Sequence, residues 1–119
     1  MSEHHAEPDH AHQLKARMRL DLKDAMKGRR TAEITVLRIL LAAIDNAEAP
    51  DIGSAPLQVT GLSGEVERLP LSPDQLEAIL VAELRDRERA AAQLTPLGQA
   101  QRAEALLREA EIVRRYCGG

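Results

Sequence analysis

Aromatic residues are almost missing from this sequence, which has one tyrosine and neither phenylalanine nor tryptophan. A hydrophobic core must therefore be built from leucine, isoleucine, valine, alanine and methionine. A chain rich in alanine, leucine, arginine and glutamate favours helices over strands. We therefore expect an all-α fold. The lack of aromatic platforms also argues against sequence-specific reading of RNA by base stacking.

Other absences narrow the class of protein. The single cysteine excludes an internal disulfide, and no apolar run approaches the roughly 20 residues that span a bilayer. The N-terminus is polar and histidine-rich and lacks a signal-peptide pattern. We predict a cytoplasmic protein without a membrane partner. The net charge of −3 gives no global argument for nucleic acid, so any basic surface must be local.

Signatures of catalysis and metal binding are also missing. The sequence contains no phosphate-binding loop, nucleophile elbow, H-E-x-x-H motif or dinucleotide fingerprint. The N-terminal histidines lack accompanying cysteines and a firm helical spacing; they are His4, His5, His10 and His12. We therefore predict no catalytic residues, no metal site and no cofactor.

The length of 119 residues fits one domain. We expect residues 1–8 to be disordered and residues 9–117 to form a single helical domain. A first helix is predicted from Asp9 to Lys27, and Gly28 would end it in the left-handed conformation. Its apolar stripe repeats every four residues and consists of Leu14, Met18, Leu22 and Met26.

A second helix is predicted from an N-cap at Thr31 to about Ala47. It is apolar on more than one side, so we expect it to be the central helix; these residues are Val36, Leu37, Ile39, Leu40, Leu41 and Ile44. Pro50 stops it. Residues 51–71 then form either a mobile loop or a short β-hairpin, a connection long enough to suggest a function or an insertion.

The third helix has the strongest start signal, because Ser72 can cap it, Pro73 suits the first position and Gln75 can complete a capping box. It should end near Gln93. Thr95-Pro96 repeats the signal and predicts a fourth helix to about Tyr116. The expected buried residues are Leu76, Ile79, Leu80 and Leu84, then Ala103, Leu106, Leu107, Ala110 and Val113. The prediction is a four-helix bundle.

A basic segment is the main candidate functional feature. Residues 14–30 hold seven cations and two anions, a local excess of five positive charges. Four of the cations recur every four residues on one predicted helix face: Lys15, Arg19, Lys23 and Lys27. Arg29, Arg30 and Arg38 lie nearby in the sequence. Such a row can bind a phosphate backbone, or it can be a solvated face whose long side chains cover the core.

Two other features have ordinary structural interpretations. Charges of both signs alternate from Glu83 to Arg89, which is typical of a solvated or helix-contacting face. Cys117-Gly118-Gly119 has no histidine nearby to act as a base, and we interpret it as a frayed helix end.

An ordered set of short motifs resembles the GatB/YqeY family across residues 14–116. The motifs are Leu22–Lys27, Thr35–Ile44, Glu83–Glu88, Gly98 and Ala110–Tyr116. The resemblance implies a helical domain similar to the tail of the B subunit of the tRNA-dependent amidotransferase, a tail associated with tRNA binding. Small members of the family carry the label of carbon–nitrogen ligase with glutamine as amido-N-donor.

One departure concerns the C-terminus. Family members usually continue past a Tyr-Leu-Pro motif into a second helical subdomain, whereas Tyr116 is followed here by Cys117, so we expect that subdomain to be absent. The leading hypothesis is a module that binds tRNA or supports amidotransferase components. The expected phosphate contacts are Lys15, Arg19, Lys23, Lys27, Arg29, Arg30 and Arg38. The alternative is a protein–protein interaction or homodimerisation module without RNA binding.

Overall fold

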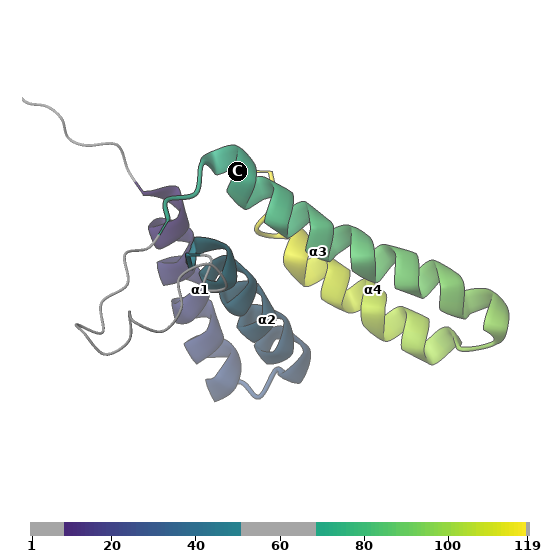
Figure 1. Cartoon of the computed structure of the whole chain (residues 1–119). Helices are drawn as coiled ribbons and strands as arrows, with labels where there is room; N and C mark the ends of the chain where they lie inside the picture. The colour runs from purple at the N-terminus through teal and green to yellow at the C-terminus, as the bar shows by residue number, and fades with distance from the viewer. Residues whose placement is uncertain (1–8, 51–68, 119) are drawn as a thin grey trace, which may run out of the picture.

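The computed structural model describes residues 9–50 and 69–118, and every regular element within them is helical (Figure 1). The elements are α1 (His10–Lys27), α2 (Thr31–Glu48), α3 (Pro73–Leu94), the short 3₁₀ helix η3 (Thr95–Leu97) and α4 (Ala100–Arg114). Within these residues, the prediction of an all-α fold with four α-helices is confirmed. The predicted tail at residues 1–8 and most of the predicted loop or hairpin at 51–71 fall outside these described ranges.

The helices form two hairpins. A tight turn joins α1 to α2, and η3 joins α3 to α4 (Figure 1). The end of the α3–α4 hairpin that carries η3 extends beyond α1 and α2, while the other end packs against them (Figure 1). None of the helices that the structure describes has the length and apolar character needed to cross a membrane.

The core lies where the two hairpins meet, and α2 supplies most of it. Its largest fully buried side chains are Val36, Leu37, Leu40 and Ile44 from α2, with Met18, Leu80 and Val113 from the other helices. The predicted core residues Ile39 and Leu107 are instead exposed. Because α2 nevertheless supplies most of the core, the central position predicted for the second helix agrees with the structure.

The buried face of α1 differs from the predicted stripe. The residues that it buries are Ala11, Lys15, Met18 and Ala25, whereas the side chain of Met26 is 48% exposed. A step of four residues overshoots one helical turn by about 40°, because an α-helix has 3.6 residues per turn. A row repeated strictly every four residues therefore drifts off the contact face, and Met26 lies at its drifted end.

The two predicted proline-containing helix starts have opposite outcomes. Ser72 Oγ accepts from the Gln75 backbone N–H at 3.0 Å, and Gln75 Oε1 accepts from the Ser72 backbone N–H at 2.8 Å, so the capping box is confirmed. The Thr95 start is wrong. Thr95 has helical backbone angles and its hydroxyl donates back to the Ala91 carbonyl at 3.0 Å, whereas an N-cap needs an extended backbone. The next α-helix, α4, begins only at Ala100.

The α1–α2 turn also departs from expectation. Gly28 has a φ of −87°, and the left-handed residue is Arg29, with a φ of 55°. A Cβ at Gly28 would lie 2.3 Å from Nη1 of Arg30, so any other residue here would require this flexible guanidinium to move aside. Arg30, rather than Thr31, is the N-cap residue of α2.

Candidate functional site

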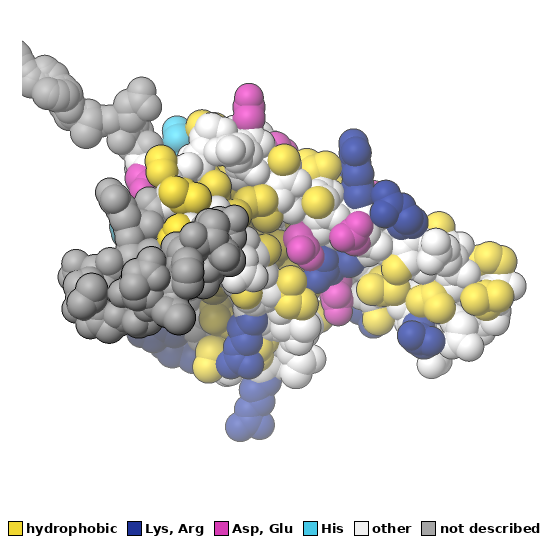
Figure 2. Space-filling model, in the orientation of Figure 1, with side chains coloured by type: hydrophobic (Ala, Val, Ile, Leu, Met, Phe, Trp, Pro, Cys, Tyr) yellow, Lys and Arg dark blue, Asp and Glu magenta, His cyan; other side chains and the backbone are white. Residues whose placement is uncertain are grey.

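Basic side chains fall into two groups that differ in the carboxylates around them. On the face seen in Figure 2, lysine and arginine side chains project at the lower end, and no acidic side chain is visible beside them in this view. Near the middle of the same face, where the α3–α4 arm begins, acidic side chains surround a basic patch (Figure 2). Lys15 and Arg87 show what carboxylate pairing does to a basic side chain.

Lys15 lies in the α1–α2 interface and is 6% exposed. Its Nζ donates to Asp45 Oδ1 at 2.9 Å and to Glu48 Oε1 at 2.5 Å. Burial lowers the pKa of Lys15, but the hydrogen bonds to Glu48 and Asp45 outweigh it, and the net pKa is raised above the ordinary value. Lys15 therefore stays charged as part of the fold and does not share a surface with the other cations of its row.

Arg87 has the same role in the second hairpin. This buried guanidinium donates to Glu83 Oε1 at 2.7 Å and, across the helix interface, to Glu109 Oε1 of α4 at 3.1 Å. It also donates to the Glu83 carbonyl at 3.0 Å. The alternating charges of α3 thus include a helix-contacting pair, one of the two arrangements that the sequence pattern indicated.

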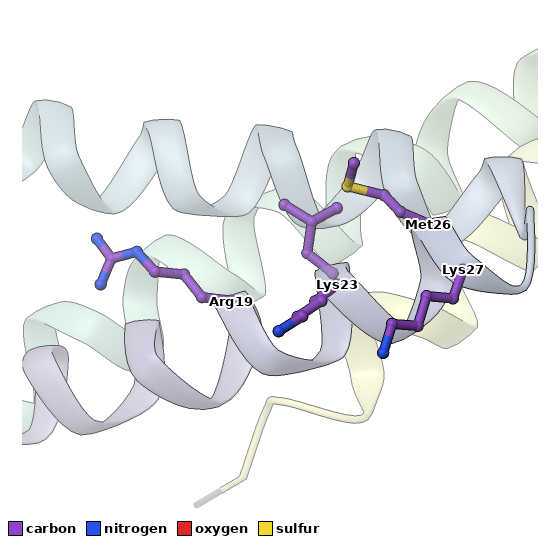
Figure 3. A pocket seen from close by; sticks show the side chains of 5 residues that line it. Arg19, Lys23, Met26 and Lys27 are labelled. Atoms are coloured by element: carbon purple, nitrogen blue, oxygen red, sulfur yellow. The ribbon is translucent and has the colours of Figure 1, made fainter.

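The other three members of the α1 row are exposed together. Arg19, Lys23 and Lys27 line an open groove of about 440 Å³ with Leu22 and Met26, here called the α1 groove. Figure 3 shows the three basic side chains along one side and Met26 turned toward the neighbouring helix. Within the described part of the chain, none of the three cations has a carboxylate partner.

The two acidic residues of α1 that could neutralise this groove bond to other elements. Asp21 Oδ2 accepts from the Tyr116 hydroxyl at 2.6 Å, and Asp24 Oδ2 accepts from Arg30 Nη2 at 2.6 Å. Tyr116 is held further by Arg17, whose guanidinium carbon lies 4.6 Å from the ring centre. Among the described residues, neither acidic residue of α1 therefore neutralises the α1 groove.

A second basic hollow lies where the α1–α2 turn meets α4, and we call it the turn cavity. It has a volume of about 510 Å³ and contains Arg29, Arg30 and Glu33 from the turn and the start of α2, and Arg108 and Arg115 from the α4 side. Sequence reasoning proposed Arg29 and Arg30 but missed Arg108 and Arg115. Arg108 and Arg115, the residue that follows α4, are seven residues or about two helical turns apart and so lie on one side of this helix. Only the tertiary fold shows that this side meets the turn.

Glu33 links the two sides of the turn cavity. Its Oε1 accepts from Arg30 Nε, and its Oε2 accepts from Arg115 Nη1 at 2.5 Å. The hydrogen bonds from Arg115 and then from Arg30 lower the pKa of Glu33 below the ordinary value. An ionised Glu33 therefore fixes two guanidinium groups, while Arg29 and Arg108 are exposed and have no carboxylate partner among the described residues.

The remaining candidates contribute less. Arg38 is exposed on α2 and lines neither hollow. Burial raises the pKa of the Cys117 thiol, which opposes its activation as a nucleophile. In residues 9–50 and 69–118, no group of three histidine, cysteine or acidic side chains is placed to hold a metal ion.

Comparisons with protein-family models, with curated proteins and with solved structures find no significant match to this chain.

Proposed function

We propose that this chain is a non-catalytic helical module that binds the phosphate backbone of tRNA through its exposed cations. The observation that supports it best is the α1 groove, where three neighbouring cations lack carboxylate partners in the described chain. The proposed contacts are Arg19, Lys23, Lys27, Arg29, Arg30 and Arg38. Lys15 is assigned to the fold, because it is buried against Glu48.

The spacing of the cations suits a polyanion. Four residues advance an α-helix by about 6 Å, so Arg19, Lys23 and Lys27 can reach successive phosphates. Like charges at this spacing disfavour the helix by a few tenths of a kcal/mol per pair, and a bound polyanion would remove that repulsion. Each phosphate neutralised releases condensed counterions, so the binding would weaken steeply with salt.

The choice of tRNA, and of an association with amidotransferase components, rests on the resemblance of the sequence to the GatB/YqeY family. A glutamine-dependent amidation assay on misacylated tRNA, with the amidotransferase present, tests that part. We expect the added chain to change the yield or the tRNA affinity of the complex without catalysing amidation alone. No effect of the chain would contradict the association while leaving direct tRNA binding to its own test.

Charge reversal tests direct binding. In the variant Lys23→Glu/Lys27→Glu, we expect the affinity for tRNA to fall by about tenfold or more, since two phosphate contacts become repulsive. The matched control is Arg85→Glu/Arg102→Glu, which makes the same change in net charge at exposed positions of α3 and α4. Circular dichroism would establish that both variants are folded. Equal losses in the two variants, or no loss in the first, would contradict the proposal.

A second candidate function is protein binding, favoured by the apolar floor of the same groove. Leu22 and the exposed Met26 lie beside the cations, an arrangement that fits an acidic amphipathic helix of a partner or of a second copy. Sedimentation combined with Met26→Gln distinguishes the two functions. Loss of self-association or partner binding with unchanged tRNA affinity would favour protein binding, whereas a monomer that binds tRNA would favour the first proposal.

A further inference from the structure

The turn cavity carries an excess of positive charge in a confined space. Four arginines line it against two carboxylates, so the lining has a net charge of +2 by simple count. One of the two carboxylates, Glu111, also faces Arg114 at 3.6 Å and is therefore shared with a cation outside the cavity. The arginines come from segments more than 70 residues apart in the chain, so the fold assembles this site.

Arginine N–H groups remain available after the internal pairs are made. Glu33 takes one N–H of Arg30 and one of Arg115, and Asp24 takes a second N–H of Arg30. Nε and Nη2 of Arg115 have no partner among the described residues, and neither have the side-chain nitrogens of Arg108 and Arg29. Two guanidinium groups are thus fixed by Glu33, and two more are exposed at the same cavity.

The backbone of the turn adds a separate observation. Arg29 has the left-handed conformation, with a φ of 55°, which L-residues other than asparagine and aspartate rarely adopt. Glycine would fit this position without strain, yet the chain has glycine one residue earlier and an arginine here. A strained residue that also lines a charged cavity is a common sign of a functional position.

From this arrangement we propose that the turn cavity binds a phosphate group, with Arg108, Arg29 and Arg115 as its donors and Glu33 as the positioning residue. The planar guanidinium fork matches two phosphate oxygens at once. The phosphate would belong either to an RNA strand or to a small oligophosphate. The inference rests on the proposed function only for the RNA source, since binding of a small phosphate does not depend on the α1 groove.

The probe is inorganic pyrophosphate, and its binding to the full chain is measured by NMR through the arginine Nε–Hε signals. We expect saturable shifts for Arg29, Arg108 and Arg115, and a loss of affinity of about tenfold in Arg108→Gln, because a charge-assisted hydrogen-bond donor is removed. The control is Arg102→Gln on the same helix, which lies outside the cavity and should bind as the native chain does.

A second variant distinguishes a loss of phosphate binding from a loss of folding. Arg29→Gly removes a donor and the backbone strain together, so it should bind pyrophosphate more weakly while its unfolding midpoint stays the same or rises.

Adding tRNA identifies the source of the phosphate. Displacement of pyrophosphate from Arg108 assigns the cavity to RNA, and joint binding assigns it to a small phosphate.

Two results would overturn the inference. One is the absence of a saturable shift with pyrophosphate, and the other is equal weakening in Arg108→Gln and Arg102→Gln. The proposed function fails separately, through unchanged tRNA affinity in Lys23→Glu/Lys27→Glu. The two failures are therefore distinguishable in the same set of variants.

Discussion

Lys15 and Lys23 lie two four-residue steps apart on α1, yet they have opposite environments. Lys15 is buried between α1 and α2 with two carboxylates of α2 on its ammonium group. Lys23 is exposed in the α1 groove without a carboxylate partner in the described chain. The helix rotates by about 80° over the two steps, which is enough to carry the second lysine off the contact face.

This contrast shows that a periodic row of cations does not define one surface. Where α2 presents Asp45 and Glu48, the cation stabilises the helix pair. Where the acidic residues of α1 bond elsewhere, as Asp21 does to Tyr116, the cations remain available to a ligand. On α1, charge compensation rather than sequence spacing separates the structural cation Lys15 from the candidate binding cations Arg19, Lys23 and Lys27.

The largest expected effect comes from removing the buried lysine. Lys15→Met takes away the ammonium that faces the buried Glu48 carboxylate, and we expect the free energy of unfolding to fall by about 3 kcal/mol. Urea denaturation measures it. Lys23→Met is the matched control and should change stability by less than about 0.5 kcal/mol. Similar losses in the two variants would contradict the contrast between these lysines.

Arg87 extends the comparison to the second hairpin. Arg87→Met leaves Glu83 and Glu109 without the guanidinium that joins them across the α3–α4 interface. We expect the free energy of unfolding to fall by about 2 kcal/mol, less than for Lys15 because these carboxylates are more exposed. Thermal denaturation of this variant beside Arg85→Met, an exposed arginine on the same helix, checks the prediction. If Arg87→Met melted at the same temperature as the native chain, the ion pairs of Arg87 with Glu83 and Glu109 would not stabilise the fold.

Replacing Arg29 should raise the stability of the fold, whereas replacing the buried cations should lower it. Arg29→Gly relieves a left-handed backbone that costs an L-residue about 1 kcal/mol, so the unfolding free energy should rise by up to about that amount. Chemical denaturation provides the measurement, and Arg38→Gly is an informative control because it places glycine inside a helix and should destabilise by about 1 kcal/mol. Destabilisation by Arg29→Gly would mean that the guanidinium contributes to the fold.

The smallest expected effect is a pH dependence due to Glu33. The pKa of Glu33 is lower in the folded chain than in the unfolded chain, because Arg115 and Arg30 bond to its carboxylate. Its contribution is therefore present above the unfolded pKa and is lost as the pH falls through the folded pKa. Glu33→Gln should give a shallower loss of stability on acidification. An acid limb as steep as that of the native chain would remove Glu33 from this role.

The sequence predicted what depends on local chemistry. The capping box at Ser72 could be located because it is set by neighbouring residues. The apolar pattern of α2 located most of its buried positions, but not Ile39, which is exposed. The prediction of a helix start at Thr95 was wrong because this residue has a helical backbone and its hydroxyl donates to the carbonyl of Ala91, in the helix before it. The predicted burial of Met26 was wrong because a row repeated every four residues drifts around the helix, away from the contact face.

The candidate site could be predicted only in part. Arg19, Lys23 and Lys27 share a surface because they belong to one helix. Burial of Lys15 depends on Glu48, 33 residues away, and the turn cavity depends on Arg115, 82 residues from Glu33. Such pairings are decided by how the hairpins pack, and a single sequence has no local signal for them.

The most direct test of the central claim is the salt dependence of tRNA binding by the native chain and by Lys23→Glu/Lys27→Glu. Each neutralised phosphate contributes about 0.7–0.9 to the slope of log affinity against log salt. Three contacts in the α1 groove predict a slope of about −2 or steeper for the native chain, and the charge reversal should reduce its magnitude by about 1.5. A flat salt dependence, or the same slope in both proteins, would contradict the claim that the uncompensated cations bind a polyanion.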